Sequence, residues 1–166
     1  MRIGLIGNRG VLGSAISTEF SEGNELIGMS RSTGYDLYKN YQDIIDICKE
    51  CDLVFNNAHA ETLQASVIRD LSETNVKLIT SGSIAANYGF SDYCKQKKII
   101  EDTHVLYIQK YPRSCLLLKM GLLEGTRIGP RTRNFNPIPL SVIMLSIRHW
   151  LINPRVTRIE FDNVKW

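Results

Sequence analysis

Tyr93 and Lys97 are the side chains in this sequence best suited to acid–base chemistry, because they lie four residues apart in a segment with helical character. Residues at that spacing project from the same face of a helix. A phenol beside an ammonium group ionises more readily, since the phenolate gains an opposite charge, and it can then act as a general acid or base toward an alcohol or a carbonyl. Ser83, at the end of a predicted strand, is a candidate to polarise the same carbonyl oxygen. The three residues predict chemistry at a C–OH or C=O group.

An exposed helix pair without a catalytic role explains this spacing equally well. Of the seven tyrosines, Tyr35 is also followed by a lysine four residues on, Lys39. That second pair lies in a predicted connector, and no strand ending in serine precedes it. The chemical hypothesis therefore depends on the elements that would carry Tyr93 and Lys97 to a ligand.

The first thirty-one residues predict an element that binds a dinucleotide. A short apolar strand at 2–6 runs without a gap into three evenly spaced glycines, a helix at 11–20 and a second strand at 25–29. In such a βαβ unit the glycines allow a tight turn and a close approach to a pyrophosphate, and the helix N-terminus presents free N–H groups. The alternative is a glycine turn without a ligand. The turn residues expected to contact the cofactor are Gly7, Asn8, Arg9, Gly10, Val11, Leu12 and Gly13.

The end of the second predicted strand favours NADP(H) over NAD(H). An acidic residue that would bind the adenosine ribose hydroxyls is absent there, and Ser30-Arg31 takes its place. Arg9 lies just before the middle glycine. Two guanidinium groups near that ribose would attract a 2′-phosphate through charge-assisted hydrogen bonds. Solvated surface arginines are the alternative.

The length and composition predict one domain spanning residues 1–166, large enough for a real core. The net charge of +3 is small and spread along the chain, which does not favour nucleic acid as a partner. No apolar run approaches the ~20 residues that span a bilayer, so we expect no membrane association. The N-terminus reads as a core strand and not as a signal peptide, which predicts a cytoplasmic protein.

Cys48 and Cys51 form a Cys-x-x-Cys pair that could indicate metal or redox chemistry. No second Cys or His pair lies at ligand spacing, and the pair spans a helix end and the following strand. We therefore expect core or surface cysteines in a reducing compartment and no metal site.

Strands and helices alternate along the rest of the chain. Predicted helices cover 38–50, 60–74, 92–102 and 140–152, and predicted strands cover 52–55, 76–80, 114–120 and 156–161; residues 104–109 either extend a helix or form a turn. This alternation predicts an α/β fold with an open parallel sheet covered on both faces, whose ligands bind beyond the carboxyl ends of the strands. The glycine turn, Asn56-Asn57-Ala58, Ser81 to Ser83 and Gly121 all fall at those ends.

The order of these pieces resembles the short-chain dehydrogenase/reductase family over nearly the whole chain, as an unusually short member. The matching motifs are Gly7-x-x-Gly10-x-x-Gly13, Asp36-Leu37, Asn56-Asn57-Ala58, Ser83-Ile84-Ala85, Tyr93-x-x-x-Lys97 and Met120-Gly121. The resemblance implies a Rossmann-type doubly wound parallel sheet in three layers, α/β/α, that binds a nicotinamide cofactor. It also implies hydride transfer to or from a small carbonyl or alcohol substrate.

The same resemblance assigns roles to individual residues. Tyr93 would be the proton donor, Ser83 the carbonyl anchor, and Lys97 the partner of the tyrosine and of the nicotinamide ribose. At the adenosine end Asp36, with Leu37 beside it, would contact the adenine amine. Further along, Asn57 and Ala58 would line the cleft, and the backbone after Gly121, near Leu122 and Leu123, would meet the carboxamide.

Several positions depart from the family pattern. The glycine spacing is that of the extended branch, which includes sugar-nucleotide epimerases and reductases, but the substrate domain of that branch has no counterpart. His59 and Met120 replace a glycine and a proline. The catalytic asparagine has no clear counterpart, Gln64 being only a guess, and the short gap before Tyr93 leaves Ser81 as a rival to Ser83.

Two further expectations concern partners. Arg127, Arg131 and Arg133 lie in a loop where the family holds its substrate, and they could bind an anionic group; a solvated loop is the alternative. Family members pair through the helices that correspond to 60–74 and 92–102, which implies a homodimer or homotetramer. Ile99 and Ile100 could belong to that face or pack on the sheet. His104 reads as a turn residue, and His149 and Trp150 read as packing residues.

Three functions are compatible with these patterns. The first is an NADP(H)-dependent oxidoreductase in which Tyr93 is the general acid or base. The second is a non-catalytic dinucleotide-binding sensor or subunit. The third is a truncated relative of the sugar-nucleotide reductases or epimerases.

Overall fold

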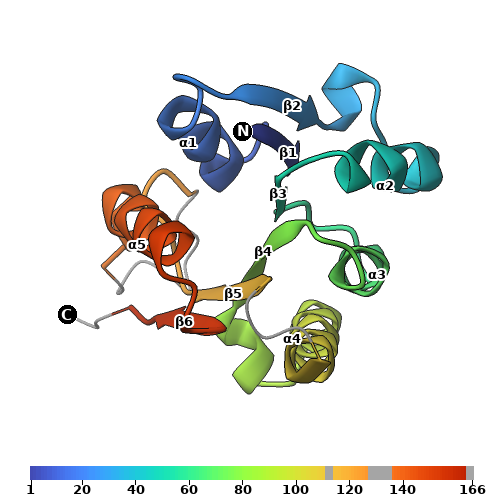
Figure 1. The fold of residues 1–166 in the computed structure, drawn as a ribbon. Helices are drawn as coiled ribbons and strands as arrows, with labels where there is room; N and C mark the ends of the chain where they lie inside the picture. The colour runs from blue at the N-terminus through green and yellow to red at the C-terminus, as the bar shows by residue number, and fades with distance from the viewer. Residues whose placement is uncertain (111–113, 127–135, 164–166) are drawn as a thin grey trace.

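Six parallel strands form one sheet in the computed structural model, which describes residues 1–110, 114–126 and 136–163 (Figure 1). The strand order in the sheet is β2-β1-β3-β4-β5-β6, and every neighbouring pair is parallel. The strands are β1 (Arg2–Ile6), β2 (Glu25–Met29), β3 (Leu53–Asn56), β4 (Lys77–Ser83), β5 (Cys115–Met120) and β6 (Arg158–Phe161). Because the chain turns to opposite sides of β1 for β2 and β3, the sheet has a topological switch point between β1 and β3.

Helices cover both faces of the sheet, as the sequence predicts (Figure 1). The core on one face takes its buried residues from α2 (Tyr41–Lys49), α3 (Leu63–Ser72) and α4 (Asp92–Lys110), and the core on the other face from α1 (Val11–Glu19) and α5 (Leu140–Ile152). Two short 3₁₀ helices, η1 (Arg31–Thr33) and η2 (Ile84–Asn87), follow β2 and β4. The inner strands are buried because helices cover both faces: all four residues of β3 and all six of β5 are buried, whereas the edge strand β6 alternates between exposed and half-buried residues.

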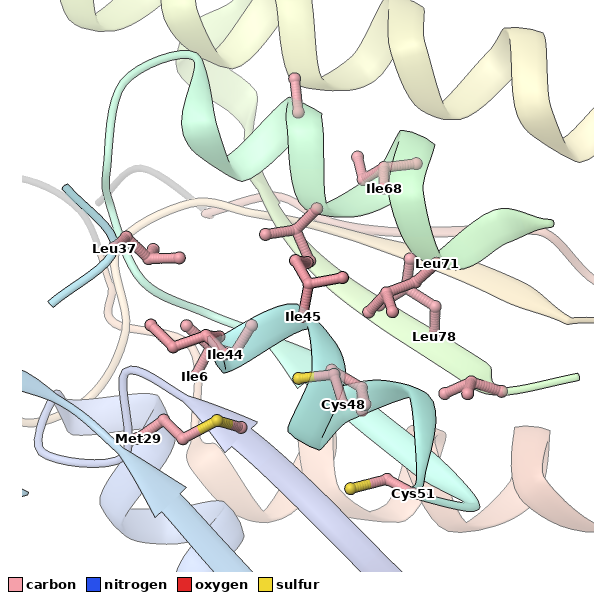
Figure 2. Close-up of a cluster of buried hydrophobic side chains, with 14 of the residues drawn as sticks. Ile6, Met29, Leu37, Ile44, Ile45, Cys48, Cys51, Ile68, Leu71 and Leu78 are labelled. Carbon is pink, nitrogen blue, oxygen red and sulfur yellow. The ribbon is translucent and has the colours of Figure 1, made fainter. Parts of the chain in front are cut away.

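Cys48 and Cys51 lie in the core between α2 and the sheet, where Figure 2 shows them with Ile6, Met29 and Leu71. Both thiols are free and buried. Burial raises the pKa of Cys48 to about 12, so its thiol stays neutral. Of the two positions that the sequence left open, core or surface, the structure places both cysteines in the core. In the part of the chain that the structure describes, no three His, Cys, Asp or Glu side chains come together as a metal site.

The helix boundaries differ from the sequence predictions where polar residues form local turns. α2 begins at Tyr41 and not at 38, because the amides of Lys39 and Asn40 donate to the Asp36 carbonyl and the amide of Tyr38 donates to the Asp36 carboxylate. α3 is likewise shorter than predicted, whereas α5 matches its predicted bounds. These turns change the entry to each helix and leave the order of elements as predicted.

The prediction that His104 belongs to a turn is wrong, because α4 continues through it to Lys110. The imidazole is 1% exposed, and its Nε2 donates to the Thr157 carbonyl at 2.9 Å. Burial lowers the pKa of His104 to about 4. Trp150 is buried as predicted, but His149 is exposed and is not a packing residue.

The remaining helix predictions concern surfaces. Of the two alternatives for Ile99 and Ile100, packing in the core holds for Ile100, which is fully buried, whereas Ile99 is exposed. Among the described helices, none combines the length and the apolarity that a bilayer crossing requires. The carboxyl ends of β1, β3, β4 and β5 meet at one edge of the sheet, and that edge is where the predicted site residues lie.

Candidate functional site

Of the three glycines in the turn after β1, the first and third are tightly packed and the second is open on its Cβ side. Gly7 has φ of 84°, and a Cβ at this position would lie 2.8 Å from the Ala58 amide nitrogen. A Cβ at Gly13 would overlap the Gly7 carbonyl oxygen and come within 2.9 Å of Asn8 Cα. At Gly10 a Cβ would meet only the Gly7 oxygen, at 3.7 Å. The first and third glycines are therefore required by packing, whereas the second leaves a free approach to the backbone.

The N-terminus of α1 opens beside Gly10 without a side chain that caps it. Gly10 is the N-cap residue, and the first turn carries no acidic residue. The first N–H groups of a helix have no intrahelical acceptors, so they can bind an anion. This cradle fits a pyrophosphate.

A cavity of about 560 Å³ adjoins the glycine turn at the switch point between β1 and β3. Arg9 and Arg31 are exposed and line it together with the half-buried Ser30 and Asp36. The other predicted cofactor residues that line this cavity are Gly7, Gly10, Leu37, Asn57 and Ala58. The amide of Tyr38 donates to the Asp36 carboxylate at 3.0 Å, which holds that side chain at the end of the cavity-lining loop.

A second cavity of about 350 Å³ contains the predicted acid–base residues. Tyr93 and Lys97 project into it from α4, and the lysine Nζ lies 5.7 Å from the centroid of the tyrosine ring. The tyrosine is 42% exposed, whereas the lysine is 5% exposed. Burial lowers the pKa of Lys97 to about 8. The two cavities share Asn57 and His59, so they lie end to end along one edge of the sheet.

The two candidate serines both line the second cavity, but their hydroxyl groups differ in what they bind. Ser81 is 8% exposed, and its Oγ accepts from Gln64 Nε2 at 3.2 Å and donates to the Asn56 carbonyl at 3.4 Å. Ser83 Oγ accepts from the Ala85 amide at 3.2 Å, which leaves its own hydrogen unused in that bond. A group that must donate to a substrate oxygen is therefore better placed at Ser83.

The backbone after Gly121 is fastened by Asn163. Leu122 N donates to Asn163 Oδ1 at 2.6 Å, and the Leu122 carbonyl accepts from Asn163 Nδ2 at 3.0 Å and from Ile138 N at 2.8 Å. A Cβ at Gly121 would overlap Asn163 Oδ1. Leu122 thus has both backbone groups occupied by bonds within the protein. Leu123 lines the cavity and stays a candidate for the carboxamide contact.

Two more side chains belong to the surroundings of the site: His59, for which the sequence indicates no role, and Gln64, which it offers only as a guess for the catalytic asparagine. His59 packs edge-on against Tyr93 with ring centroids 5.2 Å apart, and burial, followed by the charge of Lys97, lowers the pKa of this histidine. Gln64 accepts a hydrogen bond from Lys97 Nζ at 2.8 Å. The one indication of His59 in the sequence was that it replaces a glycine of the family pattern. Arg127, Arg131 and Arg133 lie outside the described residues.

The sequence matches no family model and no curated protein. Solved structures are nevertheless similar over nearly the whole chain. A dTDP-4-dehydrorhamnose reductase from Clostridium acetobutylicum has a TM-score of 0.72 at 11% identity, over 100% of this chain and 76% of that one. An alcohol dehydrogenase from the archaeon Thermococcus sibiricus, complexed with 5-hydroxy-NADP, has a TM-score of 0.68 at 16% identity, over 99% and 97%.

A UDP-glucuronic acid 4-epimerase from Bacillus cereus, in complex with NAD, has a TM-score of 0.75 at 11% identity, over 99% of this chain and 79% of that one. The fold is of the Rossmann type. At these identities the likeness establishes the architecture, and the argument for an activity has to come from the residues of the site.

Proposed function

We propose that this protein is an oxidoreductase that moves a hydride between NADP(H) and a small carbonyl or alcohol substrate. The observation that supports the proposal best is that two adjoining cavities lie along one edge of the sheet. An anion cradle at the N-terminus of α1 opens one cavity, and that cavity meets a second one that contains Tyr93, Lys97 and Ser83. A dinucleotide is long enough to occupy both, with its reactive ring beside the tyrosine. Such an arrangement at the switch point of a parallel sheet is typical of dinucleotide sites.

The residues present fit the phosphates and the adenosine of NADP(H). The α1 N-terminus and the exposed side of Gly10 would receive the pyrophosphate. Arg9 and Arg31 would hold a 2′-phosphate, because both line the adenosine cavity and Ser30 stands where a carboxylate would repel that group. Asp36 would accept from the adenine amine. This set of charges supports a preference for NADP(H) over NAD(H).

In the proposed mechanism the protein supplies the proton and the geometry. When bound, NADP(H) donates or accepts the hydride. In the direction of reduction, the Tyr93 hydroxyl gives its proton to the carbonyl oxygen as the carbon gains the hydride, so a C=O group becomes C–OH. The nearby Lys97 ammonium stabilises the phenolate that remains. Ser83 donates a hydrogen bond to the same substrate oxygen and orients it toward Tyr93.

Fluorescence titration with NADPH and NADH tests the cofactor part of the proposal. We expect NADPH to bind more tightly, with enhanced nicotinamide fluorescence. A panel of small aldehydes and ketones then tests for NADPH oxidation, and Tyr93→Phe should abolish turnover while NADPH still binds. Failure of both nucleotides to bind would refute the proposal. Binding without any Tyr93-dependent turnover would favour a non-catalytic sensor or subunit.

A second candidate places a nucleotide sugar in the same reaction cavity. What supports it is the glycine spacing of the extended branch together with the likeness to a dTDP-4-dehydrorhamnose reductase and a UDP-glucuronic acid 4-epimerase. Titration with dTDP- and UDP-sugars distinguishes the two candidates. Saturable nucleotide-sugar binding in the presence of NADP(H) would favour this one, and binding that is lost when Arg127, Arg131 and Arg133 are replaced would place the sugar in their loop.

A further inference from the structure

We propose that Gln64 is the residue that positions Lys97, and that it holds the ammonium group by a neutral amide oxygen in place of a carboxylate. The importance of this contact for catalysis rests on the proposed function, because the lysine acts there beside Tyr93. The contact itself, and its effect on the lysine, do not depend on any bound nucleotide.

The hydrogen bonds of the Gln64 side chain determine which way its amide faces. Its Nε2 lies 3.0 Å from the Asn56 carbonyl oxygen, 3.0 Å from the Ser81 carbonyl oxygen and 3.2 Å from Ser81 Oγ. A flipped amide would turn its oxygen toward two carbonyl oxygens and its NH₂ group toward an ammonium. Only the orientation seen here gives the Gln64 NH₂ group acceptors and the Gln64 amide oxygen a donor, so that oxygen must face Lys97.

Burial makes this arrangement rigid. Gln64 is 0% exposed, and its own carbonyl oxygen accepts from Asn56 Nδ2 at 2.8 Å. Gln64 lies in the first turn of α3. Its hydrogen bonds connect this helix to the carboxyl ends of β3 and β4 and to α4. Because a buried polar group without a partner is costly, each of these contacts holds the others in place. Lys97 consequently receives a fixed anchor point from elements that also form the cavity.

Among the described residues, the side chains that face Lys97 from the surrounding elements are uncharged in their ordinary forms. Tyr93 faces it from α4, His59 from the loop after β3, and Gln64 from α3. No Asp or Glu lines the reaction cavity among the described residues. Since desolvation is then uncompensated, burial lowers the pKa of Lys97 to about 8. The ammonium uses one proton for Gln64, which leaves its other two N–H donors for the tyrosine and for a ribose.

The test is an NMR titration of lysines labelled with ¹³C at Cε, recorded on the nucleotide-free protein. Gln64→Glu places a carboxylate where the amide lies, and we expect the acid dissociation constant of Lys97 to fall at least about tenfold, which moves its midpoint to higher pH. Gln64→Met removes the acceptor and should move the midpoint to lower pH. Gln42→Glu makes the same charge change on the exposed surface of α2 and should leave Lys97 unchanged.

An unchanged Lys97 midpoint in a folded Gln64→Glu or Gln64→Met protein, judged by circular dichroism, would overturn the proposal. Opposite shifts in the two variants would support it, and a merely structural glutamine would lower thermal stability without moving the midpoint. If Gln64→Glu does not fold, Gln64→Met alone decides by the direction of its shift. Because no nucleotide is added, this result is independent of whether NADPH binds.

Discussion

Replacing Gly10 by alanine should separate nucleotide binding from folding, because this glycine is open on its cavity side. Its φ of −74° is accessible to any residue, and an added Cβ would meet only the Gly7 oxygen, at an ordinary contact distance of 3.7 Å. Replacing a glycine N-cap by alanine costs roughly 0.5–1 kcal/mol, and restricting the unfolded chain returns about 0.4–1 kcal/mol. We expect the free energy of unfolding to change by less than about 1 kcal/mol.

The same methyl group should obstruct the ligand. It would occupy the face of the turn where a pyrophosphate must approach the backbone, and it would push the phosphates away from the α1 N–H groups. We expect the Kd for NADPH to rise at least about tenfold, which is about 1.4 kcal/mol. Nicotinamide fluorescence measures the affinity, and thermal unfolding without nucleotide measures the stability.

Gly13→Ala is the matched control, since it adds the same group to the same turn on its packed side. Its Cβ would overlap the Gly7 oxygen and crowd Asn8, so the backbone has to move. Such overpacking costs about 1–3 kcal/mol, which lowers Tm by roughly 2–12 °C in a chain of this size. If Gly10→Ala bound NADPH as the wild type does, the turn would not be the phosphate site, and the reasoning would be refuted.

Three further predictions follow from the charges of the site and the core. Replacing both Arg9 and Arg31 by alanine should raise the Kd for NADPH at least about tenfold and change the Kd for NADH by less than about threefold. Equal losses of affinity for the two nucleotides in fluorescence titrations would exclude a 2′-phosphate contact. Tyr93→Phe should lower kcat by roughly 10²–10⁴ with an unchanged Kd for NADPH, and retained turnover would rule out this phenol as the proton donor. For His104, the folded pKa of about 4 lies below the ordinary value of 6.5, so the unfolded chain binds more protons between these values. Urea titrations should therefore show stability falling as pH drops from about 6.5 to about 4, and His104→Gln should flatten this dependence.

The fold was predictable from the sequence because local patterns and tertiary structure agree along most of the chain. Buried strands such as Cys115–Met120 are continuous apolar runs, and the glycines at 7 and 13 stand where the backbone leaves no room for a side chain. The relation of Tyr93 to Lys97 was predictable for the same reason, since helical spacing alone brings them together.

The errors and omissions have a common physical origin in contacts between residues distant in sequence. Gln64 could be only a guess for the catalytic asparagine, because it lies 33 positions from Lys97 and nothing near it in the chain indicates that its amide is buried between two strand ends. His104 looks polar and turn-like until Thr157, 53 residues further on, supplies the acceptor that makes its burial tolerable. Ile100 and Ile99 are identical in type, and only the orientation of α4 decides which one faces the core.

The bonds of Asn163 to the backbone at Leu122 have a consequence for the order in which the protein matures. The larger cavity is lined by residues up to Ala60, all of which lie in little more than the first third of this sequence. The backbone at Leu122, which lines the second cavity, is held by an amide that is synthesised some forty positions later. The linings of the two cavities therefore become available at different times during synthesis, and the cavity that contains Tyr93 is completed after the one beside the glycine turn.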